Sequence, residues 1–565
     1  MEMFITRLTS ARRNLLAASV CVAIASLDVA SVSHSASGNR IDVANCEDDG
    51  SAGTLRAAIE GASDGDTIDL SGLACSLITL QSGSLVSPVG NLSIVGPGAN
   101  ALTIDGNDNF RVLQGSFLDI EGLTIANGRS SNLARGACIL ADRLSLTDVS
   151  LTHCITLSAT SALGGAAFVS GELIMRSASI VGSGAAGASY VKGGAAFVGG
   201  TATLYDSIIS GNNVQATGAA YGGAISANLG ITLHGSTIEG NSAQSSTDSA
   251  YGGGLHSSGG DISILDGSIV SGNSVRSEQA YAFGGGVDAG IALVPTGIVA
   301  AHNSTITGNS ASSACSVCLV SGGGVHAFDS IDAAYSTFSY NEATCDDSNS
   351  QCSAGGGAMT AFGQSASSSI AVRNSTISGN NVAGGTGAFG AGGGVMAGGG
   401  LRIVAHDSTI AFNDANTLGG GIAATSSLSA PSELISTIVA SNHSSGGAGD
   451  IVAGPFGNEL TFDGSNNIVT AADANVTLPG DTSTDDPLLL PLATDPGSVT
   501  ATHALAAGSP AIDAGANPDN LVADQRGLPY ARVVGAFADI GAYEFGNDPP
   551  SEQPIFADGF DPPIP

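Results

Sequence analysis

The sequence predicts an all-β fold built as a single parallel β-solenoid, in which short strands stack one coil upon the next. Two recurring phrases lead to this prediction. The first is Ser-[Thr/Ile]-[Ile/Val/Phe]-x-x-Asn, with the asparagine five residues after the serine in all copies but the last, which begins at Ser436 and slips by one residue. The second is a Gly-Gly pair between successive copies. A fixed period of roughly 30 residues is typical of repeat proteins.

Each phrase predicts one feature of the coil. We expect the asparagines to form a ladder at a turn, where each side-chain amide bonds with the one above it. The Gly-Gly pairs should supply positive φ at a second corner without steric cost. The ladder residues are Asn212, Asn241, Asn273, Asn309, Asn341, Asn380, Asn413 and Asn442. The pairs begin at Gly193, Gly222, Gly252, Gly284, Gly322, Gly355, Gly392 and Gly419.

The residues between the phrases favour strands over helices. Helical repeats of this length need long apolar stretches at 3.6-residue spacing. These repeats instead contain short β-branched runs interrupted by glycine, such as Ile231–Leu233 and Leu401–Ile403. One apolar position of the Ser phrase should stack into an internal column formed by Ile209, Ile238, Val270, Ile306, Phe338, Ile377, Ile410 and Ile438.

Residues 1–36 have the pattern of a secretory signal. Arg7, Arg12 and Arg13 form a basic start, and Leu15–Leu27 is an apolar run that is too short to span a bilayer. No other stretch is long and apolar enough to do so. We therefore expect an exported protein, secreted or at the cell surface, with no transmembrane segment in the mature chain.

The rest of the chain divides into four parts. Residues 37–70 are expected to form an N-terminal cap, with a short amphipathic helix at Thr54–Glu60 and the first strand at Thr67–Leu70. Residues 71–470 hold the coils, residues 471–545 a C-terminal cap, and residues 546–565 a flexible tail rich in proline and acidic residues. A cap is needed because the open end of a solenoid exposes its core and its strand edges.

The beginning of the coils resembles bacterial exported right-handed parallel β-helix proteins, including the CSLREA-domain group. The residues that carry this resemblance are Gly53-Thr54-Leu55-Arg56, Gly65-Asp66-Thr67-Ile68 and Gly96-Pro97-Gly98. The repeats are similar to those of polymorphic outer membrane proteins, whose Phe-x-x-Asn form is kept at Phe338–Asn341. The resemblance implies a right-handed, pectate-lyase-like β-helix.

The C-terminal region resembles the choice-of-anchor Q region that closes many β-helix surface proteins. The match rests on Gly508–Gly515, Asp524–Gly527 and Asp539–Glu544. Its charged residues are either catalytic or structural, and a structural pair is the commoner use. We expect Arg526 to pair with one of the carboxylates of Asp513, Asp524, Asp539 or Glu544 and so to lock the cap.

Eight cysteines follow the expected signal, and an even number in an exported protein suggests disulfides. They are Cys46, Cys75, Cys138, Cys154, Cys315, Cys318, Cys345 and Cys352. Proximity in sequence favours Cys46–Cys75 and Cys138–Cys154. For the other four, the register of successive coils favours Cys315–Cys345 and Cys318–Cys352. The rival arrangement places one bridge within each loop.

Charge limits the partners of this chain. It carries 16 basic and 49 acidic residues, a formal net charge of −33, and such a surface repels nucleic acid and anionic membranes. We expect a monomer with no cofactor. Acidic residues within Cys345–Cys352 and around Asp481–Asp486 are candidate Ca²⁺ ligands on net charge alone.

The coils lack the residues expected of an enzyme. A polysaccharide lyase needs a base and clustered acids, and a hydrolase needs two carboxylates at a fixed separation. Basic residues are few and scattered between Val149 and Asn442, and the histidines there lie near coil corners. We therefore predict a non-catalytic adhesion or structural protein that binds a polysaccharide or a host-surface ligand. The alternative is a lyase or hydrolase that acts on an acidic polysaccharide.

Overall fold

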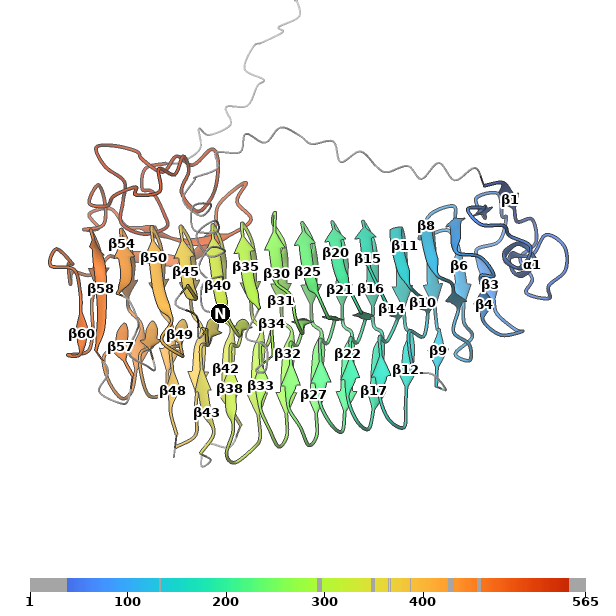
Figure 1. Ribbon diagram of the computed structural model, residues 1–565. Coiled ribbons are helices and arrows are strands. Elements are labelled where there is room, and N and C mark those ends of the chain that lie inside the picture. The colour runs from blue at the N-terminus through green and yellow to red at the C-terminus, as the bar shows by residue number, and fades with distance from the viewer. Residues whose placement is uncertain are drawn as a thin grey trace, which may run out of the picture. The chain divides into compact units, whose positions relative to one another are not determined.

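The computed structural model describes residues 38–547, apart from 132–133, 292–296, 347–350, 364, 366, 387, 425–430 and 455–458. The expected signal segment and residues 548–565 of the expected tail lie outside the described residues. The described chain forms a single parallel β-solenoid, with strands stacked in rows along its axis (Figure 1). Among the described residues, no helix is long and apolar enough to cross a membrane.

A complete coil contributes strands to four parallel sheets. In one coil, β20 (Thr201–Tyr205) and β21 (Ile208–Ser210) belong to sheet 1, and β22 (Asn213–Ala216) belongs to sheet 2. The coil continues with β23 (Ala220–Tyr221) in sheet 3 and β24 (Ile225–Ala227) in sheet 4. Every one of these strands pairs in parallel with its equivalent in the next coil. Sheets 1 to 4 hold 28, 11, 8 and 13 of the described strands.

Sheets 3 and 4 meet at the corner formed by the Gly-Gly pairs. Sheet 3 consists of β13 (Ala162–Leu163), β18 (Val191–Lys192), β23, β28 (Ala250–Tyr251), β33 (Ala282–Phe283), β38 (Leu319–Ser321), β43 (Ser353–Gly355) and β48 (Gly390–Ala391). Sheet 4 consists of β4 (Leu85–Val86), β7 (Leu113–Gln114), β10 (Ile139–Ala141), β14 (Ala167–Val169), β19 (Ala196–Val198), β24, β29 (Leu255–Ser257), β34 (Val287–Ala289), β39 (Val325–Ala327), β44 (Met359–Ala361), β49 (Val395–Ala397), β53 (Ile422–Ala424) and β57 (Ile451–Ala453).

The solenoid begins earlier than the sequence indicated. The first strand is β1 (Arg40–Asp42), which pairs in parallel with β2 (Thr67–Asp69). The helix α1 (Leu55–Glu60) lies between them, and Leu55 and Ile59 are buried against the first coils. The prediction that Thr67–Leu70 is the first strand was therefore wrong, because a helix can be inserted between two stacked coils.

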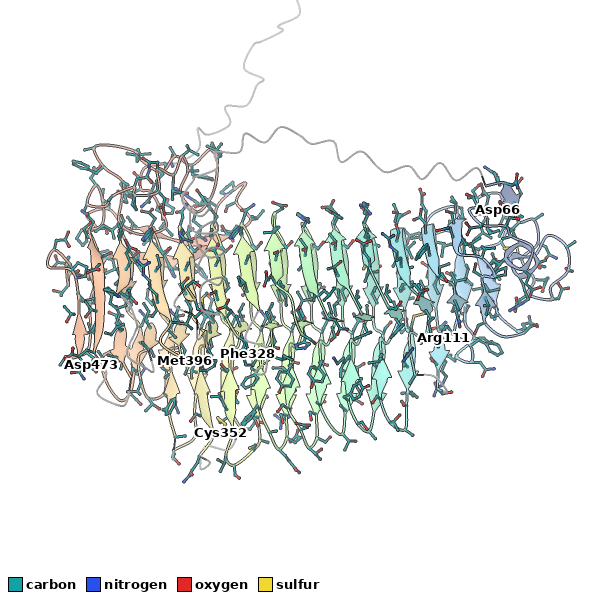
Figure 2. All side chains as sticks on the ribbon, in the orientation of Figure 1. Asp66, Arg111, Phe328, Cys352, Met396 and Asp473 are labelled. Carbon is teal, nitrogen blue, oxygen red and sulfur yellow. A yellow bond between two sulfur atoms is a disulfide. The ribbon has the colours of Figure 1, made fainter. Side chains whose placement is uncertain are left out.

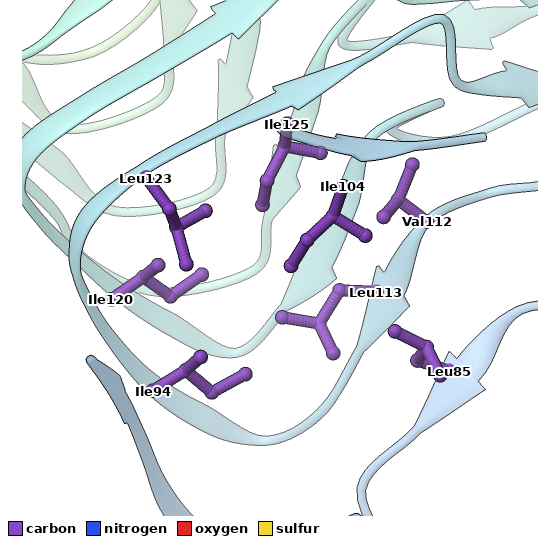
Figure 3. A pocket seen from close by; sticks show the side chains of 8 residues that line it. All are labelled: Leu85, Ile94, Ile104, Val112, Leu113, Ile120, Leu123 and Ile125. Carbon is purple, nitrogen blue, oxygen red and sulfur yellow. The ribbon is translucent and has the colours of Figure 1, made fainter. Parts of the chain in front are cut away.

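The interior is divided into two apolar lobes. The larger lobe fills the space between sheets 1 and 4, and the smaller one lies between sheets 2 and 3 and is rich in alanine. Near the N-terminal end, eight aliphatic side chains line a gap in the core that is too small to hold a water molecule (Figure 3). Such close packing maximises dispersion contacts, and truncation of one large aliphatic side chain typically costs about 2–5 kcal/mol.

Between the two lobes, the Gly-Gly pairs form a narrow waist. Gly222 has φ +61°, and a Cβ atom on Gly223 would lie 2.1 Å from the carbonyl oxygen of Gly253 and 2.6 Å from the carbonyl carbon of Ser242. No side chain fits at this position, so glycine lets the corner backbone press against the opposite side of the coil. In the sixth repeat the positive φ falls on Gly356 rather than on the predicted Gly355, which instead occupies the register position of Ser321.

The asparagines line the other side of the waist as a continuous ladder. The Nδ2 of Asn241 donates to the Oδ1 of Asn273 at 3.0 Å and to the carbonyl of Ile209 at 3.0 Å, while its backbone N–H donates to the same Oδ1. Equivalent bonds link every neighbouring pair from Asn212 to Asn442. Each amide thus satisfies buried backbone groups of two coils.

The ladder has polar ends that the repeat pattern did not reveal. At one end the backbone N–H of Ser183 donates to Asn212, and at the other Asn442 donates to the Oδ1 of Asp450 at 2.9 Å. The second oxygen of Asp450 accepts bonds from Thr470 and Ala471. Burial raises the pKa of Asp450, although these hydrogen bonds oppose the shift.

The eighth repeat keeps the five-residue spacing to its asparagine, contrary to the prediction that it begins at Ser436 and is longer by one residue. Thr437 takes the serine position, since its hydroxyl donates to Ala405 and Ile435 as the serines of earlier repeats do. Asn442 then stands five residues later, as in every other copy. The prediction that Ile438 joins the internal column was wrong, because Val439 pairs with Ile410 at that position. Ile438 instead faces outward into a separate apolar cluster.

Three disulfides are formed among the described residues: Cys46–Cys75, Cys138–Cys154 and Cys345–Cys352. Cys315 and Cys318 are free thiols. The predicted bridges Cys315–Cys345 and Cys318–Cys352 were therefore wrong. The first fails because Cys345 is opposite Ser313, two residues from Cys315. The second pair is in register, but Cys352 bonds within its own loop.

The C-terminal residues fold back over the outer face of sheet 1 (Figure 1). Threonines of the repeated Ser-Thr phrase anchor them: Thr305 and Thr337 donate to the carbonyls of Val499 and Ala501, and Thr376 donates to Gln525. Ile438 packs with Leu505, Ile540 and other residues of this segment in an apolar cluster. The cap prediction implied that this segment covers the open end of the solenoid. The described residues also cover its side, on the outer face of sheet 1.

Buried ion pairs hold this segment together. Arg526 pairs with Asp524 at 2.6 Å and lies between the rings of Tyr530 and Tyr543. Arg532 pairs with Asp407 of the coils at 2.8 Å, so one buried charge pair joins the segment to the solenoid. The other predicted cap residues accept backbone bonds: Asp513 from Ala536 and Phe537, Asp539 from Asp513 and Phe545, and Glu544 from Val534 and Asp539.

The ladder predicts the effect of removing one amide. Replacing Asn309 or Asn380 by leucine should lower the free energy of unfolding by roughly 1–3 kcal/mol, because backbone groups in two coils lose their partners. Urea-induced unfolding measures this change. Asn381→Leu is the matched control, since the Asn381 side chain lies beside the ladder and donates to the side chain of Glu342 rather than to a residue of the ladder. Equal stability of all three variants and the wild type would refute the ladder's contribution.

The C-terminal segment should be most stable on the acid side of neutrality. Burial raises the pKa of Glu544 from 4.5 to about 7, and it also raises the pKa values of Asp407, Asp524 and Asp539. The folded state therefore holds protons that the unfolded state has lost, so this stability is fully present below about pH 4.5 and is lost as pH rises through about 7.

The melting temperature of the wild type should therefore be higher at pH 5 than at pH 8. The difference should be smaller in Glu544→Gln, which cannot titrate, than in the wild type or in Glu459→Gln, which alters an exposed side chain. An unchanged difference in Glu544→Gln would contradict the assignment.

Candidate functional site

The outer faces of sheets 3 and 4 meet along a concave corner, which we call the elbow. It is bounded by two columns of residues. One column directly precedes each Gly-Gly pair and contains Lys192, Tyr221, Tyr251 and Phe283. The other follows the pair on sheet 4 and contains Phe168, Phe197, Ser226, His256, Asp288 and His326. Side chains on the outer faces of two sheets can touch only where the corner between them is concave.

Stacked rings fill the elbow. Tyr221 stacks on Tyr251 with ring centroids 5.0 Å apart, and both rings contact His256. Further along the axis, Phe283 stacks on His326 at 4.7 Å. Phe328, labelled in Figure 2, meets His326 edge-on at this end of the row. In-register coils lie about 4.8 Å apart, which places equivalent rings at stacking distance.

Three buried groups form a polar chain beneath the rings. The Nδ1 of His256 lies 2.8 Å from one oxygen of Asp288, and the Nδ1 of His326 lies 2.7 Å from the other. All three side chains are fully buried. Burial pushes the pKa of Asp288 up, but the hydrogen bonds and charges of both histidines outweigh it, so that the pKa falls below its usual value.

The hydrogen-bonded side chains of His256, Asp288 and His326 are inaccessible to a substrate. A histidine held by an aspartate is a common general base, but such a base must lie within reach of the group whose proton it takes. Here His256 also contacts the hydroxyl of Ser258, and the rings of Phe283 and Phe328 cover His326. The arrangement therefore fixes the rings of the elbow in place rather than reacting with a ligand.

An open hollow of about 610 Å³ lies where the elbow borders the loops of three successive coils. Lys192 and Tyr221 line it together with the exposed Tyr190 and Asp248. The Lys192 ammonium lies 5.0 Å from the Tyr221 ring centroid. Burial lowers the pKa of Lys192, and it raises that of Tyr221 with help from the charges of Asp248 and Asp288. The tyrosine hydroxyl thus stays neutral, and the lysine gives up its proton more easily than usual.

The repeat pattern contained a signal for the elbow that single motifs do not show. Each residue of the sheet 4 column stands four positions after the first glycine of a pair, as His256 follows Gly252 and Asp288 follows Gly284. The sequence interpretation treated the histidines one at a time as corner residues. His256 and His326 do lie at such a corner, but this interpretation did not reveal that aligned repeats bring them to the two sides of Asp288.

Those expected calcium ligands that the structure describes do not converge on a common point. Asp481 accepts a bond from Asn466, Asp485 from Ser483, and Asp486 from Leu488. Residues 347–350 of the other acidic loop lie outside the described residues. Within the described part of the chain, no group of three or more His, Cys, Asp or Glu side chains is placed to hold a metal ion. Calcium binding stays a prediction.

Comparisons with known proteins bear on the fold alone. No family model matches the chain, and no curated protein matches it. The crystal structure of the pectate lyase Pel9A is similar over 90% of this chain and 96% of that one, with 12% sequence identity and a TM-score of 0.29. The parallel pairing of the strands establishes the all-β solenoid fold without this comparison.

Removing the central carboxylate should destabilise the elbow. Asp288→Ala leaves two buried histidine N–H groups without an acceptor, and loss of one partner from a buried charged network costs roughly 3–5 kcal/mol. Chemical denaturation measures the loss. Asp463→Ala removes an exposed carboxylate and should change little. If both variants unfold at the same denaturant concentration, the hydrogen bonds of Asp288 to the two histidines do not stabilise the fold.

Proposed function

We propose that the protein is a non-catalytic β-helix protein that binds a polysaccharide along the elbow. The observation that carries this proposal is the hollow bounded by Tyr190, Lys192, Tyr221 and Asp248. A few polar groups beside aromatic rings in a concave site are typical of small-ligand and saccharide recognition. Tyrosine faces suit the apolar face of a sugar ring, while the ammonium, carboxylate and hydroxyls suit its polar edge.

The geometry favours an extended ligand over a compact one. The hollow crosses three coils, and the row of aromatic rings continues from Tyr221 through a stacked contact to Tyr251 and a tilted contact to Phe283. The exposed residues Tyr190 (46% exposed) and Tyr281 (48% exposed) each directly precede a strand of sheet 3, β18 and β33. A chain of sugars lying parallel to the solenoid axis can meet one ring per coil, at about the spacing of one strand.

One observation favours an enzyme instead. Lys192 has a lowered pKa in a hollow that is open to solvent, and a polysaccharide lyase requires a base that removes a proton. A hydrolase is less well supported, since Asp248 is the single carboxylate among the described residues that line the hollow. The lyase reading is therefore the second candidate.

Export and surface location belong to the same proposal. The three disulfides support folding in an oxidising compartment, in agreement with the secretory pattern of residues 1–36. The resemblances of the repeats and of the C-terminal residues to exported surface proteins point the same way. We propose a secreted or cell-surface monomer whose ligand is a polysaccharide, either free or on a cell surface.

Calorimetric titration of the protein with a panel of neutral and acidic polysaccharides tests the proposal. At least one polysaccharide should bind, and Tyr221→Ala and Lys192→Ala should each bind it about tenfold more weakly, which is about 1.4 kcal/mol. Tyr205→Ala is the matched control, because Tyr205 stacks on His234 and carries Arg176 over its ring on sheet 1, outside the elbow. Equal losses in all three variants would contradict binding at the elbow.

The same mixtures distinguish the lyase. Ultraviolet absorbance from unsaturated products that appears with the wild type and disappears in Lys192→Ala would establish the second candidate. Binding without such products supports the first, and no binding to any member of the panel would overturn both.

A further inference from the structure

Four cysteines meet in the smaller apolar lobe, and only two of them are bonded to each other. Cys318, Cys345 and Cys352 belong to one buried cluster, and Cys315 packs against it. Cys345 and Cys352 form a disulfide within one loop, whereas Cys315 and Cys318 are thiols. A dithiol thus lies beside a disulfide, which is the pair of reactants needed for thiol–disulfide exchange.

The register brings one thiol next to one bonded sulfur. Leu319 pairs with Ser353 in neighbouring parallel strands, and the Ser353 N–H donates to the Cys318 carbonyl at 2.9 Å. Cys318 and Cys352 therefore occupy equivalent positions in successive coils, about 5 Å apart, which is within the Cα separation of a disulfide. The Cys318 Sγ also lies 3.3 Å from the hydroxyl of Ser313, the residue opposite Cys345.

We infer that this cluster is an internal thiol–disulfide exchange site, which converts the Cys345–Cys352 bridge within one loop into a Cys318–Cys352 bridge between two coils. The Cys318 thiolate attacks the Cys352 sulfur. A Cys318–Cys352 bond forms, the Cys345–Cys352 bond breaks, and Cys345 leaves as a thiolate. Cys345 takes up one proton in place of the proton that Cys318 released, so no outside oxidant or reductant is needed.

The exchange should be slow and dependent on pH. Burial raises the pKa of the Cys318 thiol to about 12. Only the thiolate attacks, and its fraction rises about tenfold per pH unit below that pKa. Cys315 is half-buried and three residues away, so it can attack Cys318 in turn and release Cys352, which would move the bridge to Cys315–Cys318 and leave Cys345 and Cys352 as thiols.

The product should resist unfolding better than the starting form. A bridge from Cys318 to Cys352 spans 34 residues, whereas the present bridge spans 7. The longer loop removes more freedom from the unfolded chain, and the equilibrium constant for unfolding should fall by about tenfold. The exchange would thus staple two coils of the solenoid after the chain has folded.

The variant Cys315→Ser in the otherwise intact protein tests this inference, because it removes the thiol that can undo the product. The folded protein is held at pH 7, 8 and 9, quenched with acid, alkylated and digested without reduction. Mass spectrometry should find a peptide joining Cys318 to Cys352, with Cys345 alkylated, at a rate that rises about tenfold per pH unit. The urea midpoint should rise as this peptide accumulates.

Cys318→Ser is the matched control, since it keeps Cys315 but lacks the thiol in register, and its Cys345–Cys352 bridge should persist. Recovery of only Cys345–Cys352 with alkylated Cys318 in Cys315→Ser would overturn the inference. So would loss of Cys46–Cys75 or Cys138–Cys154 in the same samples, because exchange would then result from general unfolding. A Cys318–Cys352 peptide with those two bridges intact supports it.

Discussion

The asparagine ladder at the glycine waist is the contact on which the rest of the structure depends. Two strands of backbone approach each other there without side chains between them, and their buried polar groups need partners. Asn241 illustrates how the ladder meets that need, since its amide bonds to its own coil, to the coil below and to Asn273 above. The glycines allow the approach, and the amides compensate for the polar groups it buries.

The waist also determines where function can be located. By drawing sheets 3 and 4 inward, it creates a concave corner on the outer surface of the solenoid. Residues on either side of each Gly-Gly pair then meet, and Lys192, Tyr221 and His256 come together although they lie in three different coils. The outer face of sheet 1 is by contrast partly covered by the C-terminal segment, through Arg532 and Asp407 among others. The residues of the elbow lie on sheets 3 and 4, whereas the contacts of the described C-terminal segment are with sheet 1.

Much of the fold was predictable from the sequence because one repeat constrains all the others. The ladder positions follow from the spacing of the Ser phrase, and only the eighth repeat misled, where Thr437 replaces serine. Contacts outside the repeat were harder to predict. The Cys345 position depends on a register that differs by two residues from the one assumed, and loop lengths between coils do not reveal it. Likewise, no pattern in residues 471–545 indicates that their partner is the threonine row of sheet 1.

The buried polar residues of the elbow were missed for a related reason. His256, Asp288 and His326 are far apart in sequence and unremarkable one by one, and they acquire meaning only when the repeats are aligned and the corner is known to be concave. In a solenoid, chemistry lies across coils rather than along the chain, so motifs of neighbouring residues are the wrong signal.

Site-resolved hydrogen exchange of the folded protein tests the ladder's role most directly. If the waist holds the coils together, the backbone amides of Asn241, Asn273 and Asn309 should be among the slowest to exchange, because each donates to a buried asparagine oxygen. Faster exchange at these amides than at the sheet 2 strand β27 (Ser242–Ser245) would make the waist the weakest part of the coil and contradict this account.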